Sequence, residues 1–345
     1  MALAALEDVT DAIEATTDLL LPFEFRRWFR MAVIVFFVAG GGVTSPFGTG
    51  SSVSGSGGGP TPGPVENVDL PPLEEVLLVV AAVFVALLVV GAIVWAIGSV
   101  MEFVFVDALR TGDIRVRAPF RDHLGRGLRL FGFRIGVSLL SLATLAGAGA
   151  AIAFGALGGS VLSWDPAQAF AFVALMIPVF ALVVFVSGLL LGFTTVFVVP
   201  IMLLEDRGVL SAWRRFWPTL RANLGEYAAY AVLGFLLTIL VGLATGIIVS
   251  IAAVVVLIPF AILGGIVFVA AGGAFSTPAL AVLGVLVAVY LVLVLVVTAL
   301  VAVPFQTFLR YYALFVLGDT NDEFDAIADV RASVREGGPT PPTAG

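Results

Sequence analysis

Long runs without a charged side chain dominate the sequence. Residues 227–309 contain no Asp, Glu, Lys or Arg, and the runs at residues 76–101, 135–164 and 166–204 are equally free of charge. A helix needs about 20 apolar residues to cross the hydrocarbon core of a bilayer, so each run is long enough to span it. Only 12% of the 345 residues are charged, against about 25% in soluble domains. The runs predict an all-α protein, a polytopic transmembrane helical bundle.

The arginines set the expected orientation of the helices. All 17 basic residues are Arg, and most lie near the start of the chain, at residues 106–134 and at residues 205–226. Because basic loops stay on the cytoplasmic side, these three segments are expected inside and the Arg-free segments at 44–71 and near 165 outside. Two further spans return the chain to the inside. We therefore expect a plasma-membrane protein with six spans and both termini in the cytoplasm.

The six expected spans pair into three helical hairpins. A basic segment followed by an apolar run occurs three times, starting at residues 24, 124 and 212. The first span is the weakest, because its apolar part is short. Seven spans are the alternative, if the last charge-free run breaks both near Pro259 and at 272–278. The six spans are expected at about residues 24–43, 74–105, 130–158, 168–203, 226–256 and 279–309.

Three segments outside the spans differ in composition. Residues 1–24 carry apolar residues at helical spacing with acids between them, which predicts an amphipathic helix, either on the membrane surface or simply solvated. Residues 44–71 are rich in Gly, Ser, Thr and Pro and predict a flexible external loop. Residues 318–345 are expected to form an acidic disordered tail, so that the transmembrane domain covers residues 25–317.

The sequence lacks the residue patterns of an enzyme or a metal protein. It has no Cys, and His123 is its only His, so it offers no cluster of ligands for a metal site. Paired carboxylates, a Ser/His/Asp set, a phosphate-binding loop and a dinucleotide fingerprint are also missing. The net charge of -7 excludes a basic nucleic-acid footprint. We expect a non-enzymatic protein with no cofactor, no metal and no nucleic-acid partner.

Residues 205–227 carry the most informative local pattern. Steps of three and four place apolar residues on one helical face and arginines on the other, which predicts a cytoplasmic interfacial helix against anionic inner-leaflet lipid. The alternative is a helix that serves only topology and anchoring. With the basic segments before the first and third spans, the candidate lipid contacts are Arg26, Arg27, Trp28, Arg30, Arg126, Arg129, Trp213, Arg214, Arg215, Trp217 and Arg221.

Small residues recur at steps of four in several of the predicted spans. Without bulky side chains, such residues let helix backbones approach closely in a membrane. They predict packing within the chain, with a homo-oligomer or another membrane-protein partner as the alternative. The candidate packing residues are Gly147, Gly155, Gly188, Gly192, Gly242 and Gly246.

Ionisable residues deep in a span would indicate coupled transport, and none is expected here. Glu102 and Asp107 fall at the inner end of the second span and are expected to pair with nearby arginines. The hydroxyls of Ser138, Ser141 and Thr144 could line a polar path or bond to their own helix backbone. The leading hypothesis is therefore lipid or envelope organisation, or an accessory scaffold. The alternative is a transporter or channel-like permease for a neutral or amphiphilic solute.

Two segments carry a resemblance to known families, PFEFRRWFRMAVIVFFVAGGG (22–42) and VVPIMLLEDRGVLSAWRRFWPTLRANLGEYAAYAVLGFLL (198–237). With them the chain resembles a multi-pass membrane family of haloarchaea that has no assigned function. The second segment is also similar, more distantly, to the six-helix membrane domain of some bacterial glycerophosphodiester phosphodiesterases. The resemblance implies that fold and not the activity, because the catalytic domain with its metal-binding Glu and His residues has no counterpart here. The matching positions are Pro200, Glu205, Asp206, Gly208, Arg214 and Arg215.

Overall fold

The computed structural model describes residues 4–40, 73–158, 164–273 and 276–336. Every regular element in this part of the chain is a helix. The segment at 44–71, predicted to be a flexible loop, lies outside the described residues. The fold class predicted from the charge-free runs, all-α, is confirmed.

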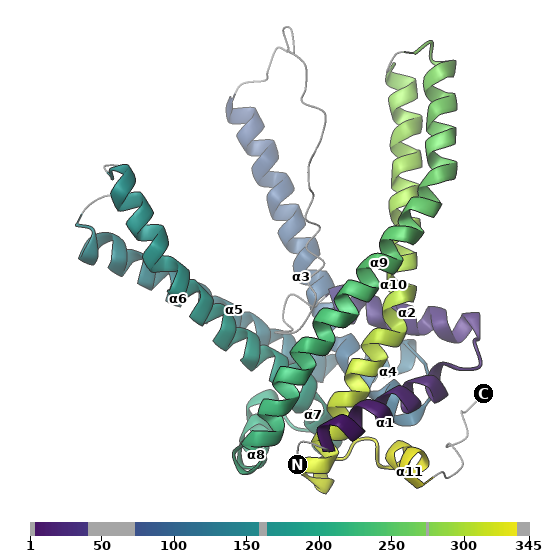
Figure 1. The fold of residues 1–345 in the computed structure, drawn as a ribbon. Helices are drawn as coiled ribbons and strands as arrows, with labels where there is room; N and C mark the ends of the chain where they lie inside the picture. The colour runs from purple at the N-terminus through teal and green to yellow at the C-terminus, as the bar shows by residue number, and fades with distance from the viewer. Residues whose placement is uncertain (1–3, 41–72, 159–163, 274–275, 337–345) are drawn as a thin grey trace.

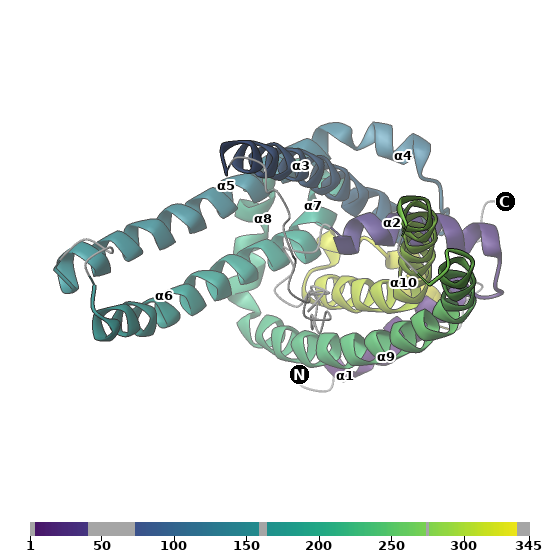
Figure 2. The same cartoon turned by 90° about the horizontal axis from the view of Figure 1, so that it is seen from above.

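The helices form three arms that spread from a common base (Figure 1). The first arm is α3 (Leu73–Thr111). The second arm pairs α5 (Leu124–Ala150), which continues as the π-helix η2 (Ala151–Ala156), with α6 (Pro166–Phe193). The third arm pairs α9 (Leu224–Ala270) with α10 (Thr277–Thr320). Viewed from above, the three arms point in different directions (Figure 2).

The base contains the shorter helices and the lower ends of the arms. The shorter helices are α1 (Ala4–Leu20), α2 (Phe25–Gly40), α4 (Arg117–Asp122), the π-helix η4 (Thr194–Val198), α7 (Val199–Glu205), α8 (Val209–Ala222), the 3-10 helix η5 (Asp322–Phe324) and α11 (Ala328–Glu336). They pack against the lower ends of the long ones, as α1 and α2 do against α10.

Five helices in the described part are long and apolar enough to cross a membrane. They cover residues 77–111, 124–155, 166–205, 224–270 and 277–320. The run for which two or three spans were considered forms two helices, because α9 continues through Pro259 to Ala270 and α10 begins at Thr277. Membrane helices tolerate such a proline. The break near Pro259 that the seven-span alternative requires is therefore absent.

The helix α2 is too short to count among these five. Its 16 residues extend about 24 Å at 1.5 Å per residue, whereas the hydrocarbon core is about 30 Å thick. Its middle is buried against α3 and α10 through Met31, Ile34 and Val35. The first span expected at 24–43 is thus a base helix over its described length, and residues 41–43 lie outside the described part.

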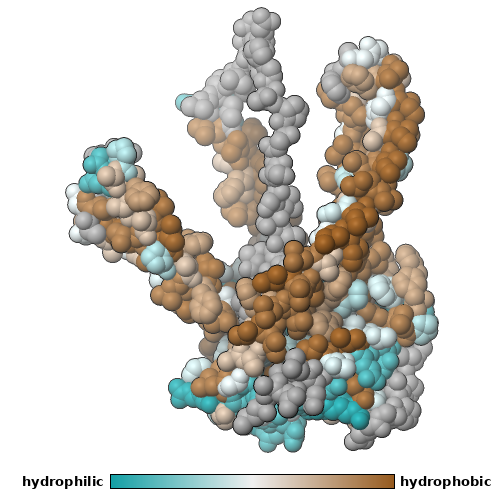
Figure 3. Space-filling view, in the orientation of Figure 1, coloured by the Kyte–Doolittle hydropathy of each residue, from teal (hydrophilic) through white to brown (hydrophobic). Residues whose placement is uncertain are grey.

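The buried core lies in the base, and the arms expose their apolar side chains. Phe103 of α3, Phe197 of η4 and Phe315 of α10 are fully buried there. Figure 3 shows the arms covered by hydrophobic residues and the hydrophilic residues gathered on the base. Contiguous apolar surface of this extent marks contact with lipid or with another protein. Together with the five long helices, this surface indicates a membrane protein.

The N-terminal helix α1 packs one of its faces against the rest of the protein. Ala12, Ala15 and Leu19 are buried, and α1 packs mainly against α10. The residues that would have entered a membrane surface are therefore already covered. The spacing of the apolar residues correctly indicates the face that α1 buries. That face packs against α10 and not against a membrane surface.

The C-terminal segment was predicted to be disordered over residues 318–345, and most of it is ordered. Phe324 and Ile327 are buried, and α11 follows them. Arg331 lies 2.7 Å from an Asp319 carboxylate oxygen, and Arg335 also pairs with Asp319, at 3.0 Å. Two buried apolar side chains and these ion pairs hold the segment on the base. Residues 337–345 lie outside the described part.

Arg335 also connects the two ends of the chain, through Asp8 at 2.9 Å and Asp11 at 2.7 Å. Burial raises the pKa of the Asp8 carboxyl to about 7, and the neighbouring Asp319 adds to the rise while Arg335 opposes it. The folded protein therefore binds a proton that the unfolded chain has released above pH 4. Stability from this carboxyl is present at low pH and is lost as the pH rises through about 7.

Replacing Asp8 with Asn is expected to remove this pH dependence, because the amide resembles the protonated acid. We expect the variant to be more stable than the wild type at pH 8, by on the order of 1 kcal/mol, and similar to it at pH 4. Thermal unfolding in detergent at both pH values measures the difference. Asp18→Asn, at an exposed position of the same helix, is the matched control. An unchanged pH profile in Asp8→Asn would contradict the assignment.

Candidate functional site

Three charges that border the charge-free runs meet inside the protein. Glu102 follows the run in α3, Arg134 precedes the run in α5, and Arg310 follows the run in α10. Each therefore comes from a different arm, at the level where the apolar arm joins the base. The three side chains are 1–6% exposed. We call this group the ionic hub.

Glu102 accepts hydrogen bonds from both arginines of the ionic hub. Arg134 Nη2 lies 3.2 Å from Glu102 Oε1, and Arg310 Nη2 donates to Oε2 of the same carboxylate. Arg134 also donates to Ser99 Oγ at 3.1 Å and to Thr195 Oγ1 at 2.8 Å. Breaking such a pair leaves an uncompensated buried charge. The hub thus joins three arms through one carboxylate.

The π-helix η4 supplies the remaining acceptor of the hub. Arg310 Nη1 donates to the backbone carbonyl of Thr195 at 2.7 Å. A π-helix interrupts the regular hydrogen bonding of an α-helix, and short π-helices often occur at functional sites. Next to it, Trp213 of α8 donates from Nε1 to Thr194 Oγ1 at 2.9 Å. The irregular turn therefore connects α8 to the end of the second arm.

Sequence reasoning found part of this arrangement. Glu102 pairs with arginines, as expected, but Asp107 lies 3.9 Å from His123 Nε2 instead. Arg134 and Arg310 were not among the predicted site residues. The signal that could have found the hub is that these three charges lie at the ends of charge-free runs on the same predicted side. Such charges at one depth can meet when their helices converge.

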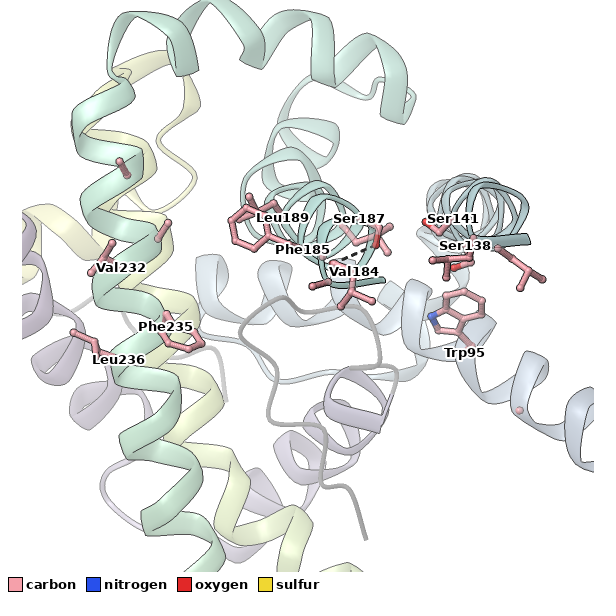
Figure 4. Close-up of a pocket in the computed structure, with 18 of the residues that line it drawn as sticks. Trp95, Ser138, Ser141, Val184, Phe185, Ser187, Leu189, Val232, Phe235 and Leu236 are labelled. Atoms are coloured by element: carbon pink, nitrogen blue, oxygen red, sulfur yellow. Dashed lines mark hydrogen bonds between the residues drawn. The ribbon is translucent and has the colours of Figure 1, made fainter. Parts of the chain in front are cut away.

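A cavity of about 1370 Å³ opens between the arms, and α3, α5, α6 and α9 line it. Figure 4 shows Trp95, Ser138 and Ser141 on one side and Val184 and Ser187 of α6 facing them. The rest of the lining is mostly apolar. The ionic hub lies about one helical turn below, because Ser138 follows Arg134 by four residues. The cavity therefore has apolar walls and a charged group beneath its floor.

The hydroxyls considered for a polar path are partly used by their own helix. Ser141 Oγ donates to the Val137 carbonyl at 2.9 Å, and Thr144 Oγ1 donates to the Leu140 carbonyl at 2.8 Å. Ser138 and Ser141 line the cavity, and Thr144 does not. A hydroxyl that donates to its own helix has little donor capacity left, so Ser141 and Thr144 contribute little to a polar path.

Several of the predicted lipid contacts are held by the protein. Trp28 Nε1 donates to the Leu20 carbonyl at 3.0 Å, and Arg126 pairs with Asp206 at 2.8 Å. Arg215 pairs with Glu205 at 3.3 Å and with Glu323. Arg27 and Arg30 donate to the carbonyls of Gly112 and Ile114, at 3.5 and 3.4 Å.

Other predicted lipid contacts stay free. Arg26, Arg129 and Arg214 are exposed, and no ion pair or hydrogen bond of their side chains occurs within the described residues. The guanidinium of Arg221 lies 4.7 Å from the centre of the Trp217 ring, and both side chains are exposed. The free arginines come from α2, α5 and α8, which all begin or lie in the base.

The apolar face predicted for residues 205–227 mostly packs against protein. Val209 and Phe216 are buried, and the Phe216 ring is 5.6 Å from Phe197 and 5.2 Å from Tyr227, centre to centre. Only Trp217 of the predicted tryptophan pair is exposed. The expectation that this whole face lies at headgroup depth is therefore corrected. The core of the base covers Val209 and Phe216, whereas Trp217 and Leu224 stay exposed.

The predicted glycine contacts are mostly open within the chain. A Cβ added at Gly147, Gly155 or Gly246 would meet no atom of the described residues within 4 Å. Gly192 is buried, whereas Gly188 and Gly242 are half-buried. The closest helix approach at a glycine of α5 is at Gly127, where an added Cβ would lie 2.6 Å from the Val100 Cα. Oligomer contacts of the open glycines remain a prediction.

Five long apolar helices, exposed apolar arms and a polar base define a helical membrane protein. The chain belongs to a family of unknown function (DUF7544), whose sequence profile matches residues 3–327. The match covers all three arms and nearly all of the base. No curated protein and no solved structure was found to match the chain.

Proposed function

We propose that the chain is a non-enzymatic plasma-membrane protein that organises lipid or serves as an accessory scaffold, with its base on the cytoplasmic side. Its basic segments support this orientation, because α4, α8 and the start of α5 all lie in the base. The end of α9 and the start of α10 lie at the far end of the third arm, and residues 227–309 contain no arginine. Both termini are then cytoplasmic.

Orientation can be measured with single cysteines, because the natural chain has none. Thr111 and Ser211 are exposed positions of the base, and Ala167 and Ser276 are exposed positions at the tips of two arms. A membrane-impermeant thiol reagent applied to intact cells is expected to label cysteines only at the two tip positions. Labelling at Ser211→Cys from outside would reverse the proposed orientation.

The free arginines of the base carry the proposal of lipid contact. Arg26, Arg129 and Arg214 are exposed on α2, α5 and α8, which lie in the base or begin there, and a guanidinium group can pair with a lipid phosphate. Each basic residue near an anionic membrane surface contributes about 1 kcal/mol of attraction. Partners that fit this surface are the anionic lipids of the inner leaflet.

Replacing Arg26, Arg129 and Arg214 together with Gln is expected to abolish the enrichment of anionic lipid around the protein. The enrichment can be measured by native mass spectrometry after exchange into nanodiscs of mixed phosphatidylglycerol and phosphatidylcholine. The control replaces Arg115 and Arg207, which are exposed but paired with Asp113 and Glu205. Equal enrichment in the triple variant and the control would contradict lipid contact through these arginines.

The cavity supports a second candidate, a permease for a neutral or amphiphilic solute. Its lining is mostly apolar, and its volume of about 1370 Å³ exceeds the roughly 300–1,000 Å³ of common small-molecule pockets. Ala231 lines the cavity, so Ala231→Trp should fill part of it. If the wild type takes up a solute into proteoliposomes and Ala231→Trp blocks this uptake, the permease is favoured over a scaffold.

A further inference from the structure

Two buried nitrogen donors have no acceptor among the described residues, one in the lining of the cavity and one about a helical turn beneath it. They are Trp95 Nε1 and Arg134 Nε. Trp95 lines the cavity, and in Figure 4 the nitrogen edge of its indole faces the space toward α6. An unsatisfied buried donor costs about 1–3 kcal/mol. An acceptor that enters from the cavity would remove part of this cost.

The charge beneath the floor is not balanced. The ionic hub holds two guanidinium groups and one carboxylate, so it has a formal charge of +1. Arg134 uses its two terminal nitrogens for Ser99, Glu102 and Thr195, which leaves Nε as its free donor. A single negative charge beside the hub would neutralise it. Electrostatic attraction to such a group is strong where water is excluded.

The walls of the cavity are apolar and can pack against the acyl chains of a lipid. Leu142, Val184 and Val232 contribute apolar side chains from three different helices, and all three are exposed at the open sides of the cavity. The floor lies where the charge-free runs end, which is the depth of inner-leaflet headgroups in the proposed orientation. A lipid held there would point its chains along the arms, as its neighbours in the leaflet do.

We propose that the cavity binds one anionic membrane lipid, with its phosphate near Trp95 and Arg134 and its chains along α6 and α9. The charge complementarity at the floor and the apolar walls select this amphiphile over a free anion or a neutral lipid. The site deepens the proposed function and rests on the chain being embedded in lipid. It is separate from the base arginines, which contact lipid from outside.

The test uses the full chain in detergent, titrated with dioleoyl phosphatidylglycerol or with dioleoyl phosphatidylcholine and followed by native mass spectrometry. We expect one tightly bound phosphatidylglycerol and at least severalfold weaker binding of phosphatidylcholine. Trp95→Phe keeps the edge contact with Phe131 but removes the donor, and should weaken binding roughly tenfold. Ala231→Trp fills the space for the chains and should abolish binding.

Two controls separate this site from the base. Trp164→Phe removes another indole donor without a partner, at the tip of the second arm, and should leave binding unchanged. The triple variant of Arg26, Arg129 and Arg214 should keep the single bound lipid while losing the general enrichment. Equal binding of the two lipids, unchanged binding in Ala231→Trp, or complete displacement by millimolar inorganic phosphate would each overturn the proposal. A loss of binding only in the triple variant would overturn it and leave the proposed function standing.

Discussion

Replacing Glu102 with Gln is expected to lower the free energy of unfolding by about 3–5 kcal/mol. The amide no longer neutralises Arg134 and Arg310, so two guanidinium groups stay buried beside each other without a counter-charge. Thermal unfolding in detergent, followed by intrinsic fluorescence, measures the loss. Adding Arg134→Met returns the hub to its wild-type charge of +1 and should recover part of the stability.

The matched control makes the same chemical change at the surface. Glu323 pairs with Arg215, and its side chain is 66% exposed. Because exposed pairs contribute about 0–1 kcal/mol, Glu323→Gln should change the unfolding midpoint little. Equal effects of the two substitutions would show that the hub does not hold the arms together.

Replacing Phe216 with Ala is expected to destabilise the protein by about 3–5 kcal/mol, as for other buried phenylalanines. Its ring is fully buried and contacts the rings of Phe197, Trp213 and Tyr227. The loss should also detach α8, which limited proteolysis within residues 209–222 would detect. Leu210→Ala, at a 68% exposed position of the same helix, should stay within about 0.5 kcal/mol.

The outcome at Phe216 also decides what the apolar face of α8 contacts. If the face lay in lipid, removing the ring would leave no cavity in the protein and would cost little stability. An unchanged free energy of unfolding in Phe216→Ala would therefore favour the interfacial interpretation of residues 205–227.

Local hydropathy was sufficient to predict the long helices. Each charge-free run is helical, and the longest run forms the two helices α9 and α10. The ends of the other long helices differ from the predicted spans by a few residues, whereas α9 and α10 extend further. At 47 residues, α9 is about 70 Å long, more than twice the thickness of the hydrocarbon core. The extra residues of α10 continue into the base, whereas those of α9 lie at the far end of the third arm.

Contacts between distant segments could not be predicted in the same way. Helical periodicity correctly gave the amphipathic faces of α1 and α8, but a pattern cannot tell whether lipid or protein covers a face. The order of residues 322–336 depends on Asp8 and Asp11, more than 300 positions earlier. The hub likewise needs Glu102 to meet Arg310, which is 208 residues away.

The shared carboxylate of Glu102 restricts how the arms can turn. Each of its two oxygens accepts from an arginine on a different helix, while Thr195 accepts from both arginines. If any one of the three helices rotated about its own axis, its side chain would swing away and at least one of these bonds would break. The rotational positions of the three arms are therefore coupled to one another, although their tips are far apart.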